Sequence, residues 1–244
     1  MPLAFSAGME YYRQQINKKR RRAGYAGFFR AYGPNGDMIT DFIWDFDGML
    51  FDTYPHTMAA FCETARRHGL SLDPGEVYEY AKVTLWHAFR QYGFTEAMVE
   101  EFYGIENDLS FPPHGKPFPM VPETLRLVKK SGGRNFLYTH RDRVALVYLE
   151  NFGLTDCFTD CVTREQGFPN KPAPDAIEDL CRRHGLNKAS VFMCGDRDID
   201  ILAGINAGVG TLLFDTEARY GDIGETRRAD GYRTLYETVL DLLS

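Results

Sequence analysis

The sequence has no long apolar run. In its 244 residues, no uninterrupted apolar segment comes near the roughly 18 residues that a membrane-spanning helix needs. The sequence also lacks the pattern of a secretory signal, because the basic cluster after residue 12 is followed by no apolar segment. We therefore expect a protein without a membrane span that works in the cytoplasm.

Cysteine is scarce and scattered. The chain has five cysteines, an odd number, at positions 62, 157, 161, 181 and 194. Cys157 and Cys161 have the spacing CxxxC, but no second pair of Cys or His residues accompanies them, so we expect no zinc site. Reduced thiols, as in a cytoplasmic protein, are the simpler interpretation.

The rest of the composition is ordinary for a globular protein. Hydrophobic residues make up 44% of the chain and charged residues 25%. These values exclude the disordered, collagen-like and coiled-coil classes. The length suffices for one large domain or two small ones.

Charge is distributed unevenly along the chain. The net charge is −6, but residues 1–40 carry seven bases and two acids, so the remainder is strongly acidic. Such a basic block is either an interaction tail for nucleic acid or anionic lipid, or a solvated helix over Met9–Arg22. We favour the helix and assign residues 1–38 to a basic N-terminal extension.

The hydrophobic pattern divides the remaining chain into two kinds of segment. Residues 39–46 are apolar, aromatic and β-branched, which predicts a buried strand. Helical periodicity follows over 58–69, over 77–88 with a stop at Gly93, and around 99–103, and then a proline-rich linker over 111–122. Beyond it, the pattern predicts strands over 135–139, 157–162, 190–194 and 211–214, alternating with helices over 123–130, 144–152, 175–184, 198–207 and 234–243.

This order of elements predicts an α/β fold. Strands that alternate with helices form a parallel sheet covered on both faces. The all-helical segment 54–110 interrupts the alternation after the first strand. We therefore expect an inserted helical subdomain with hinges near 53–55 and 111–122.

Polar side chains stand at the ends of the predicted strands or in the loops that follow them. Ligands of open α/β sheets bind outside the carboxyl ends of the strands, so these side chains are candidates for one site. The set consists of Asp45, Asp47, Thr139, Lys171, Asp196 and Asp200.

The residue types indicate phosphate chemistry. Carboxylates brought together repel unless a cation lies among them, and ligands that are all oxygen favour Mg²⁺. A lysine and a hydroxyl on neighbouring loops suit a phosphate beside the ion, and backbone N–H groups of the turn at Gly48 could add donors. One aspartate could attack phosphorus while a second transfers protons.

The ordered set resembles the four motifs of the haloacid dehalogenase-like hydrolase superfamily. The matching segments are Asp45-Phe46-Asp47-Gly48, Leu137-Tyr138-Thr139-His140-Arg141, Lys171-Pro172-Ala173-Pro174-Asp175 and Gly195-Asp196-Arg197-Asp198-Ile199-Asp200. The stretch 200–208 is close to the phosphoglycolate-phosphatase-like branch, which carries a small helical cap. The resemblance implies a doubly wound, Rossmann-like core (39–53 and 118–244) with an inserted helical cap (54–117).

The resemblance also implies a role for each residue. Asp45 would be the nucleophile that forms an aspartyl-phosphate, and Asp47 the general acid and base. Thr139, Lys171 and the turn at Gly48 would bind the phosphoryl oxygens. Mg²⁺ would be held by the Asp45 and Asp196 carboxylates and by the backbone carbonyl of Asp47. Asp200 would support the metal site without direct contact to the ion.

The implied function is a Mg²⁺-dependent phosphatase that hydrolyses a small phosphomonoester, such as a phosphoglycolate-like compound or a sugar phosphate. Two alternatives stay open: a sugar phosphomutase with the same motifs, and a nucleic-acid or ribosome-associated protein that acts through its basic arm. The cap would select the substrate. Its polar candidates are Tyr54, His56, Lys82, His87 and Arg90.

Overall fold

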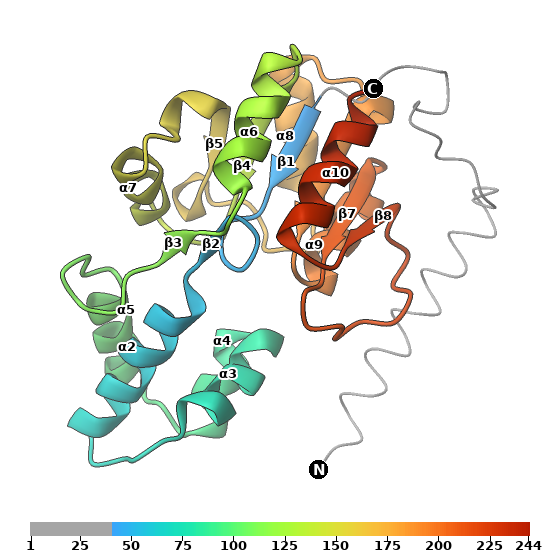
Figure 1. The fold of residues 1–244 in the computed structure, drawn as a ribbon. Helices are drawn as coiled ribbons and strands as arrows, with labels where there is room; N and C mark the ends of the chain where they lie inside the picture. Colours follow the sequence, from blue (N-terminus) through green and yellow to red (C-terminus); the bar gives the residue numbers. More distant parts are fainter. Residues whose placement is uncertain (1–40) are drawn as a thin grey trace.

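The computed structural model describes residues 41–244 (Figure 1). The helix expected over Met9–Arg22, the first two residues of the strand expected over 39–46 and the start of the core at residue 39 lie outside the described residues. Within the described part, no helix is both long enough and apolar enough to cross a membrane.

The centre of the fold is a six-stranded sheet whose neighbouring strands are all parallel. The strand order is β5-β4-β1-β6-β7-β8. The bounds are β1 (Asp41–Trp44), β4 (Arg134–Tyr138), β5 (Phe158–Val162), β6 (Val191–Gly195), β7 (Gly210–Phe214) and β8 (Arg227–Ala229). All residues of β1, β6 and β7 are buried, as expected for central strands of a parallel sheet with both faces covered.

Helices cover both faces of this sheet. One face packs against α6 (Val121–Lys130), α7 (Val144–Asn151) and α10 (Tyr232–Leu242), and the other against α8 (Asp175–His184) and α9 (Asp198–Ala207). The bounds of α8 and α9 are those predicted from the sequence. The α/β fold with a doubly wound parallel sheet is therefore confirmed.

A second group of helices lies below the sheet in Figure 1. It consists of α2 (Tyr54–Arg67), α3 (Pro74–Val83), α4 (Leu85–Gln91) and α5 (Glu96–Glu106). These helices share their own hydrophobic cluster, built around the stacked rings of Phe61 and Phe89. We call this group the cap.

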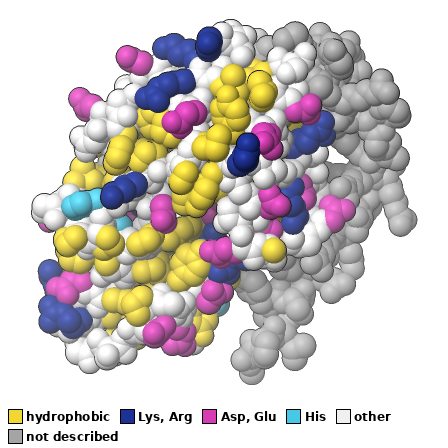
Figure 2. Space-filling model, viewed as in Figure 1, with side chains coloured by type: hydrophobic (Ala, Val, Ile, Leu, Met, Phe, Trp, Pro, Cys, Tyr) yellow, Lys and Arg dark blue, Asp and Glu magenta, His cyan; other side chains and the backbone are white. Residues whose placement is uncertain are grey.

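Two chain segments join the cap to the core and pair with each other. They are β2 (Phe51–Asp52) and β3 (Lys116–Pro117), which form a short antiparallel pair. The proline-rich stretch predicted as a linker thus contains one of these strands. Figure 2 shows hydrophobic side chains gathered on the visible face at the level of this junction.

Two details of the sequence-based prediction were wrong. The helix expected over 77–88 is divided at Thr84, whose backbone is extended (φ −162°, ψ 151°) and whose hydroxyl accepts a hydrogen bond from the His87 N–H. This is the side-chain cap that begins α4, and Thr favours that position over a helix interior. The strand β8 was not predicted, because Arg227-Arg228-Ala229 has little apolar character.

Candidate active site

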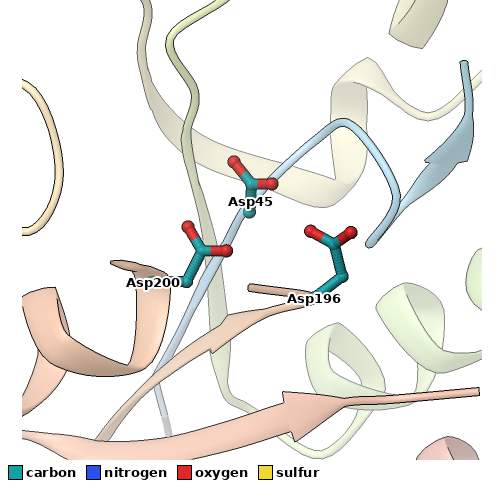
Figure 3. Close-up of side chains that lie close together, drawn as sticks. All are labelled: Asp45, Asp196 and Asp200. Carbon is teal, nitrogen blue, oxygen red and sulfur yellow. The ribbon is translucent and has the colours of Figure 1, made fainter. Parts of the chain in front are cut away.

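Three aspartates meet at the carboxyl end of the central strands. Asp45 follows β1, Asp196 follows β6, and the Asp45 N–H donates to the Cys194 carbonyl at 2.9 Å. Asp200 lies in the first turn of α9. One carboxylate oxygen of each aspartate lies within 4.8 Å of those of the others, and all three residues are buried (Figure 3).

This position follows from the order of the strands. β1 lies between β4 and β6. From β1 the chain continues to β4 on one side, and the later connection from β6 to β7 runs away from β1 on the other side. The connections therefore diverge beside β1, which leaves a crevice at the carboxyl ends of β1 and its neighbours.

Lys171 joins two of these aspartates. Its Nζ lies 2.6 Å from Asp45 Oδ1 and 2.8 Å from Asp200 Oδ1, and it donates to the Tyr138 carbonyl at 3.0 Å. The Lys171 side chain has no exposed surface. Because a buried ammonium is costly unless it is paired, these contacts fix the side chain beside Asp45.

His140 holds the loop that carries Lys171. The backbone N–H of Lys171 donates to His140 Nε2 at 2.9 Å. Burial, together with the nearby Lys171 charge, lowers the pKa of His140 to about 3. The ring is therefore neutral at physiological pH and free to accept this hydrogen bond.

The pKa values of the three acids are shifted in different directions. Burial raises the pKa of Asp45 to about 7, although the Lys171 ammonium opposes it. Burial also raises the pKa of Asp196. For Asp200 burial is again the largest effect, but Lys171 and Arg197 outweigh it and hold the pKa below its usual value.

The acidic cluster has the donor set of a site for a hard divalent cation. Asp45 Oδ2 and Asp196 Oδ1 are buried and accept no hydrogen bond from the described residues. Unpaired buried carboxylate oxygens are costly, and a cation among them would remove that cost. Because the ligands are all carboxylate oxygens, Mg²⁺ fits this site better than a metal that prefers Cys or His.

The Asp47 side chain is not part of the cluster and has other partners. Asp47 Oδ1 accepts a hydrogen bond from Thr53 Oγ1 at 2.6 Å and another from Arg141 Nε at 3.0 Å. Burial would raise the pKa of Asp47, but the Arg141 guanidinium holds it below its usual value. In this arrangement Asp47 is a carboxylate.

Arg141 also connects the core with the cap. Its Nη2 donates to Glu106 Oε1 in α5 at 2.6 Å, and the side chains of both residues are almost fully buried. Thr57 in α2 donates to the same Glu106 oxygen at 3.1 Å. One buried guanidinium thus contacts both Asp47 and a carboxylate of the cap.

The structure also places Thr139 and Gly48 at the site. Thr139 is buried directly after β4, and its Oγ1 accepts from the Arg141 N–H at 3.0 Å. Gly48 has φ +80°, and a Cβ there would lie 2.3 Å from Asp196 Oδ2, so only glycine fits. The Gly48 N–H donates to the Phe51 carbonyl within the turn, so Gly48 contributes room for the close approach of Asp196.

A cavity of about 640 Å³ opens beside Asp196, between the cap and the core. Two of the predicted cap residues, Tyr54 and Lys82, line it together with Tyr78. On the core side the lining includes Phe214 and Arg219.

The other three predicted cap residues are not among the lining residues of this cavity. His56 is fully buried, with its ring nitrogens 2.7 Å from the carbonyl oxygens of Glu106 and Pro113. His87 and Arg90 lie on α4.

Sequence reasoning missed three charged residues of this region. Arg141 and Arg197 lie inside the second and fourth motif segments, but the sequence assigned them no role. Arg141 is buried at the site, and Arg197 is partly buried there. Their position next to a strand end was a usable signal. Glu106 carried no such signal, since it is an ordinary acid near the end of a predicted helix.

Comparison with known proteins assigns the chain to a family. The family model for haloacid dehalogenase-like hydrolases matches residues 42–214. The chain therefore belongs to the haloacid dehalogenase-like hydrolases, as its motifs predicted, and is an enzyme of that family.

Two curated relatives have names that refer to phosphatases. The chain is 28% identical over 193 residues to pyrophosphatase PpaX of Halalkalibacterium halodurans, covering 75% of this chain and 87% of that protein. It is 29% identical over 128 residues to the phosphoglycolate phosphatase of Psychrobacter arcticus, covering 50% of this chain and 56% of that protein.

Solved structures share the fold. A hydrolase from Streptococcus pneumoniae is 34% identical, covers 71% of this chain and 91% of its own, and has a TM-score of 0.55. A candidate β-phosphoglucomutase from Bacteroides vulgatus is 19% identical, covers 95% and 96%, and has a TM-score of 0.69. The second likeness concerns the fold alone.

Proposed function

We propose that the protein is a Mg²⁺-dependent phosphatase that hydrolyses a small phosphomonoester through an aspartyl-phosphate on Asp45. The observation that carries this proposal is the setting of Asp45. One of its oxygens is held by Lys171 at 2.6 Å, while the other, Oδ2, is buried without a hydrogen bond. Lys171 fixes this carboxylate in the crevice, and a fixed carboxylate is suited to attack phosphorus.

In the first half-reaction, an Asp45 oxygen forms a bond to phosphorus while the bond from phosphorus to the ester oxygen breaks. Asp47 supplies the proton that the departing oxygen needs. Lys171 and the Thr139 hydroxyl bind the phosphoryl oxygens, and Lys171 offsets charge beside Asp45.

In the second half-reaction, water attacks phosphorus and Asp45 is released. Asp47, now a carboxylate, takes the proton from the attacking water. Its contacts with Arg141 and Thr53 favour this charged form. The ionised form of Asp47 is the one needed to accept a proton from water in this second half-reaction, and the protonated form is the one needed in the first.

Asp45, Asp196 and the Asp47 carbonyl would hold Mg²⁺, with Asp200 orienting Lys171 behind them. When bound, the ion neutralises charge on the phosphate and the surrounding carboxylates.

The substrate is proposed to be a small phosphorylated metabolite. The name of the phosphoglycolate phosphatase relative supports this class, and the cavity beside Asp196 offers about 640 Å³ for the organic part of the substrate. A sugar phosphomutase is the second candidate, because a chain with the same fold bears that name.

We further propose three parts for the chain. Residues 1–38 form a basic extension, residues 39–53 and 118–244 the catalytic core, and residues 54–117 the cap. None of the four sequence motifs lies before residue 39, so we assign the chemistry to the core and cap and leave nucleic-acid binding by the extension as a separate possibility. The five free cysteines suit a reducing compartment, and we propose the cytoplasm.

A panel of phosphorylated metabolites incubated with Mg²⁺ tests the function. We expect release of inorganic phosphate that stops with excess chelator. Conversion of a sugar phosphate to its isomer, without release of phosphate, would support the mutase instead. Metal-independent release of halide from 2-haloacids would contradict both.

A further inference from the structure

Lys82 of the cap contacts a proposed metal ligand. Its Nζ donates to Asp196 Oδ2 at 2.7 Å, across the boundary between α3 and the end of β6. The Tyr54 hydroxyl donates to the same oxygen at 3.3 Å, and the Lys82 ammonium lies 4.6 Å from the centre of the Tyr54 ring. The Lys82 side chain is only 10% exposed, so its charge is largely removed from water.

This lysine is placed where its charge opposes a second cation. A divalent ion bound at the unpaired Oδ1 of Asp196 would share that carboxylate with the Lys82 ammonium on Oδ2. Two cations separated by a few ångströms in a partly dehydrated site repel each other strongly. Binding of the ion and the contact between Lys82 and Asp196 are therefore antagonistic.

The other cation in the cavity lining has two carboxylate partners of its own. Arg219 donates to the two carboxylate oxygens of Glu79 at 2.9 and 2.8 Å, and it is also paired with Glu217. These partners are not metal ligands. Among the described lining residues, Lys82 is thus the cation that pairs with a proposed metal ligand, Asp196.

The balance of charge leaves a place for the ammonium once the ion and a phosphate are both present. The three clustered aspartates and a dianionic phosphate together carry five negative charges. Lys171, Arg197 and a divalent ion supply four positive charges, and Lys82 supplies the fifth. Asp47 does not enter this balance because Arg141 pairs with it.

We propose that Lys82 exchanges partners during the reaction cycle. In the absence of the ion it pairs with Asp196, and when the ion takes this carboxylate the ammonium binds an oxygen of the substrate's phosphate group. Lys82 would then be a cap residue whose binding partner changes when metal and substrate are both bound. This inference rests on the proposed function, because it requires a metal and a phosphate at this site.

Calorimetric titration of Lys82→Met tests the exchange with two probes. Mg²⁺ alone should bind about tenfold more tightly to Lys82→Met than to the wild type, because a competing charge is gone. Inorganic phosphate, titrated at saturating Mg²⁺, should bind about tenfold more weakly. General damage to the site would weaken both, so the opposite signs are diagnostic.

Three further variants complete the experiment. Lys116→Met removes an exposed lysine outside the cavity and should leave both affinities unchanged. Lys82→Arg keeps the charge and should bind Mg²⁺ as the wild type does. If Lys82→Met folds poorly, judged by its melting curve, Lys82→Gln takes its place, with the same expectations.

Unchanged or weaker Mg²⁺ binding in Lys82→Met would overturn the proposed competition. Tighter Mg²⁺ binding with unchanged phosphate binding would overturn the transfer to phosphate. A wild type that binds no Mg²⁺, or that binds it no better than Asp196→Asn does, would instead refute the metal site of the proposed function.

Discussion

Replacing Asp45 by Asn should inactivate the enzyme and, without metal, stabilise it. Asn has nearly the same shape but no charge to attack phosphorus, so we expect turnover to fall by at least about a thousandfold. The same carboxylate is buried in the folded protein, and this burial raises its pKa from 3.8 to about 7. Ionised Asp45 is therefore destabilising to the metal-free fold.

The pKa shift determines the size and sign of the effect on stability. Between about pH 4 and pH 7 the folded wild type keeps a proton on Asp45 that the unfolded chain releases. Protonated Asp45 therefore makes its full contribution to the free energy of unfolding below about pH 4, and this contribution is lost as the pH rises through about 7. Over this range the loss amounts to at most about 4 kcal/mol.

Urea unfolding of wild type and Asp45→Asn in chelator, at several values between pH 4 and pH 8, measures this difference. We expect similar stabilities near pH 4 and a growing advantage for the variant up to pH 8. In the variant, Lys171 still pairs with Asp200 at 2.8 Å, so its charge stays compensated. A difference that is independent of pH, or that grows in favour of the wild type, would refute the reasoning.

Three further predictions concern the acid, the lysine and the extension. Asp47→Asn should slow hydrolysis of alkyl phosphates more than that of p-nitrophenyl phosphate, whose leaving group needs less protonation; steady-state kinetics with equal losses on both esters would contradict this role. Lys171→Ala should lower turnover and weaken phosphate binding, because Asp45 and Asp200 lose a shared cation; normal kinetics would reduce Lys171 to a loop residue. A chain that starts at Met38 should fold and keep its phosphatase activity, as melting curves and a phosphate assay would show; a folded but inactive protein would contradict the proposed division into parts.

The strands and most helices of the core were predictable because their pattern is local. The segments 175–184 and 198–207 have helical periodicity, Gly185 and Gly208 directly after their last residues, and left-handed backbone at those glycines. Local pattern failed at Thr84, where apolar spacing continued through a residue whose side chain caps the next helix. Capping took precedence over periodicity there.

The candidate site was predictable only in part for a related reason. Asp45 and Asp196 follow strands that are neighbours in the sheet, so their meeting follows from the topology of a parallel fold. The partners of Asp47 could not be found this way. Arg141 and Glu106 are 35 residues apart and lie in the core and the cap, and only the packing of these two parts brings them together.

The most direct test of the central claim is to look for the phosphorylated enzyme. Wild type is mixed with Mg²⁺ and the best substrate of the metabolite panel, quenched in acid within the first turnovers, and digested for mass spectrometry. We predict one phosphoryl group on the peptide that contains Asp45, removable by hydroxylamine and absent from Asp45→Asn treated in the same way. Rapid release of phosphate by the wild type without any phosphorylation of Asp45, or with the phosphoryl group on another residue, would contradict the account.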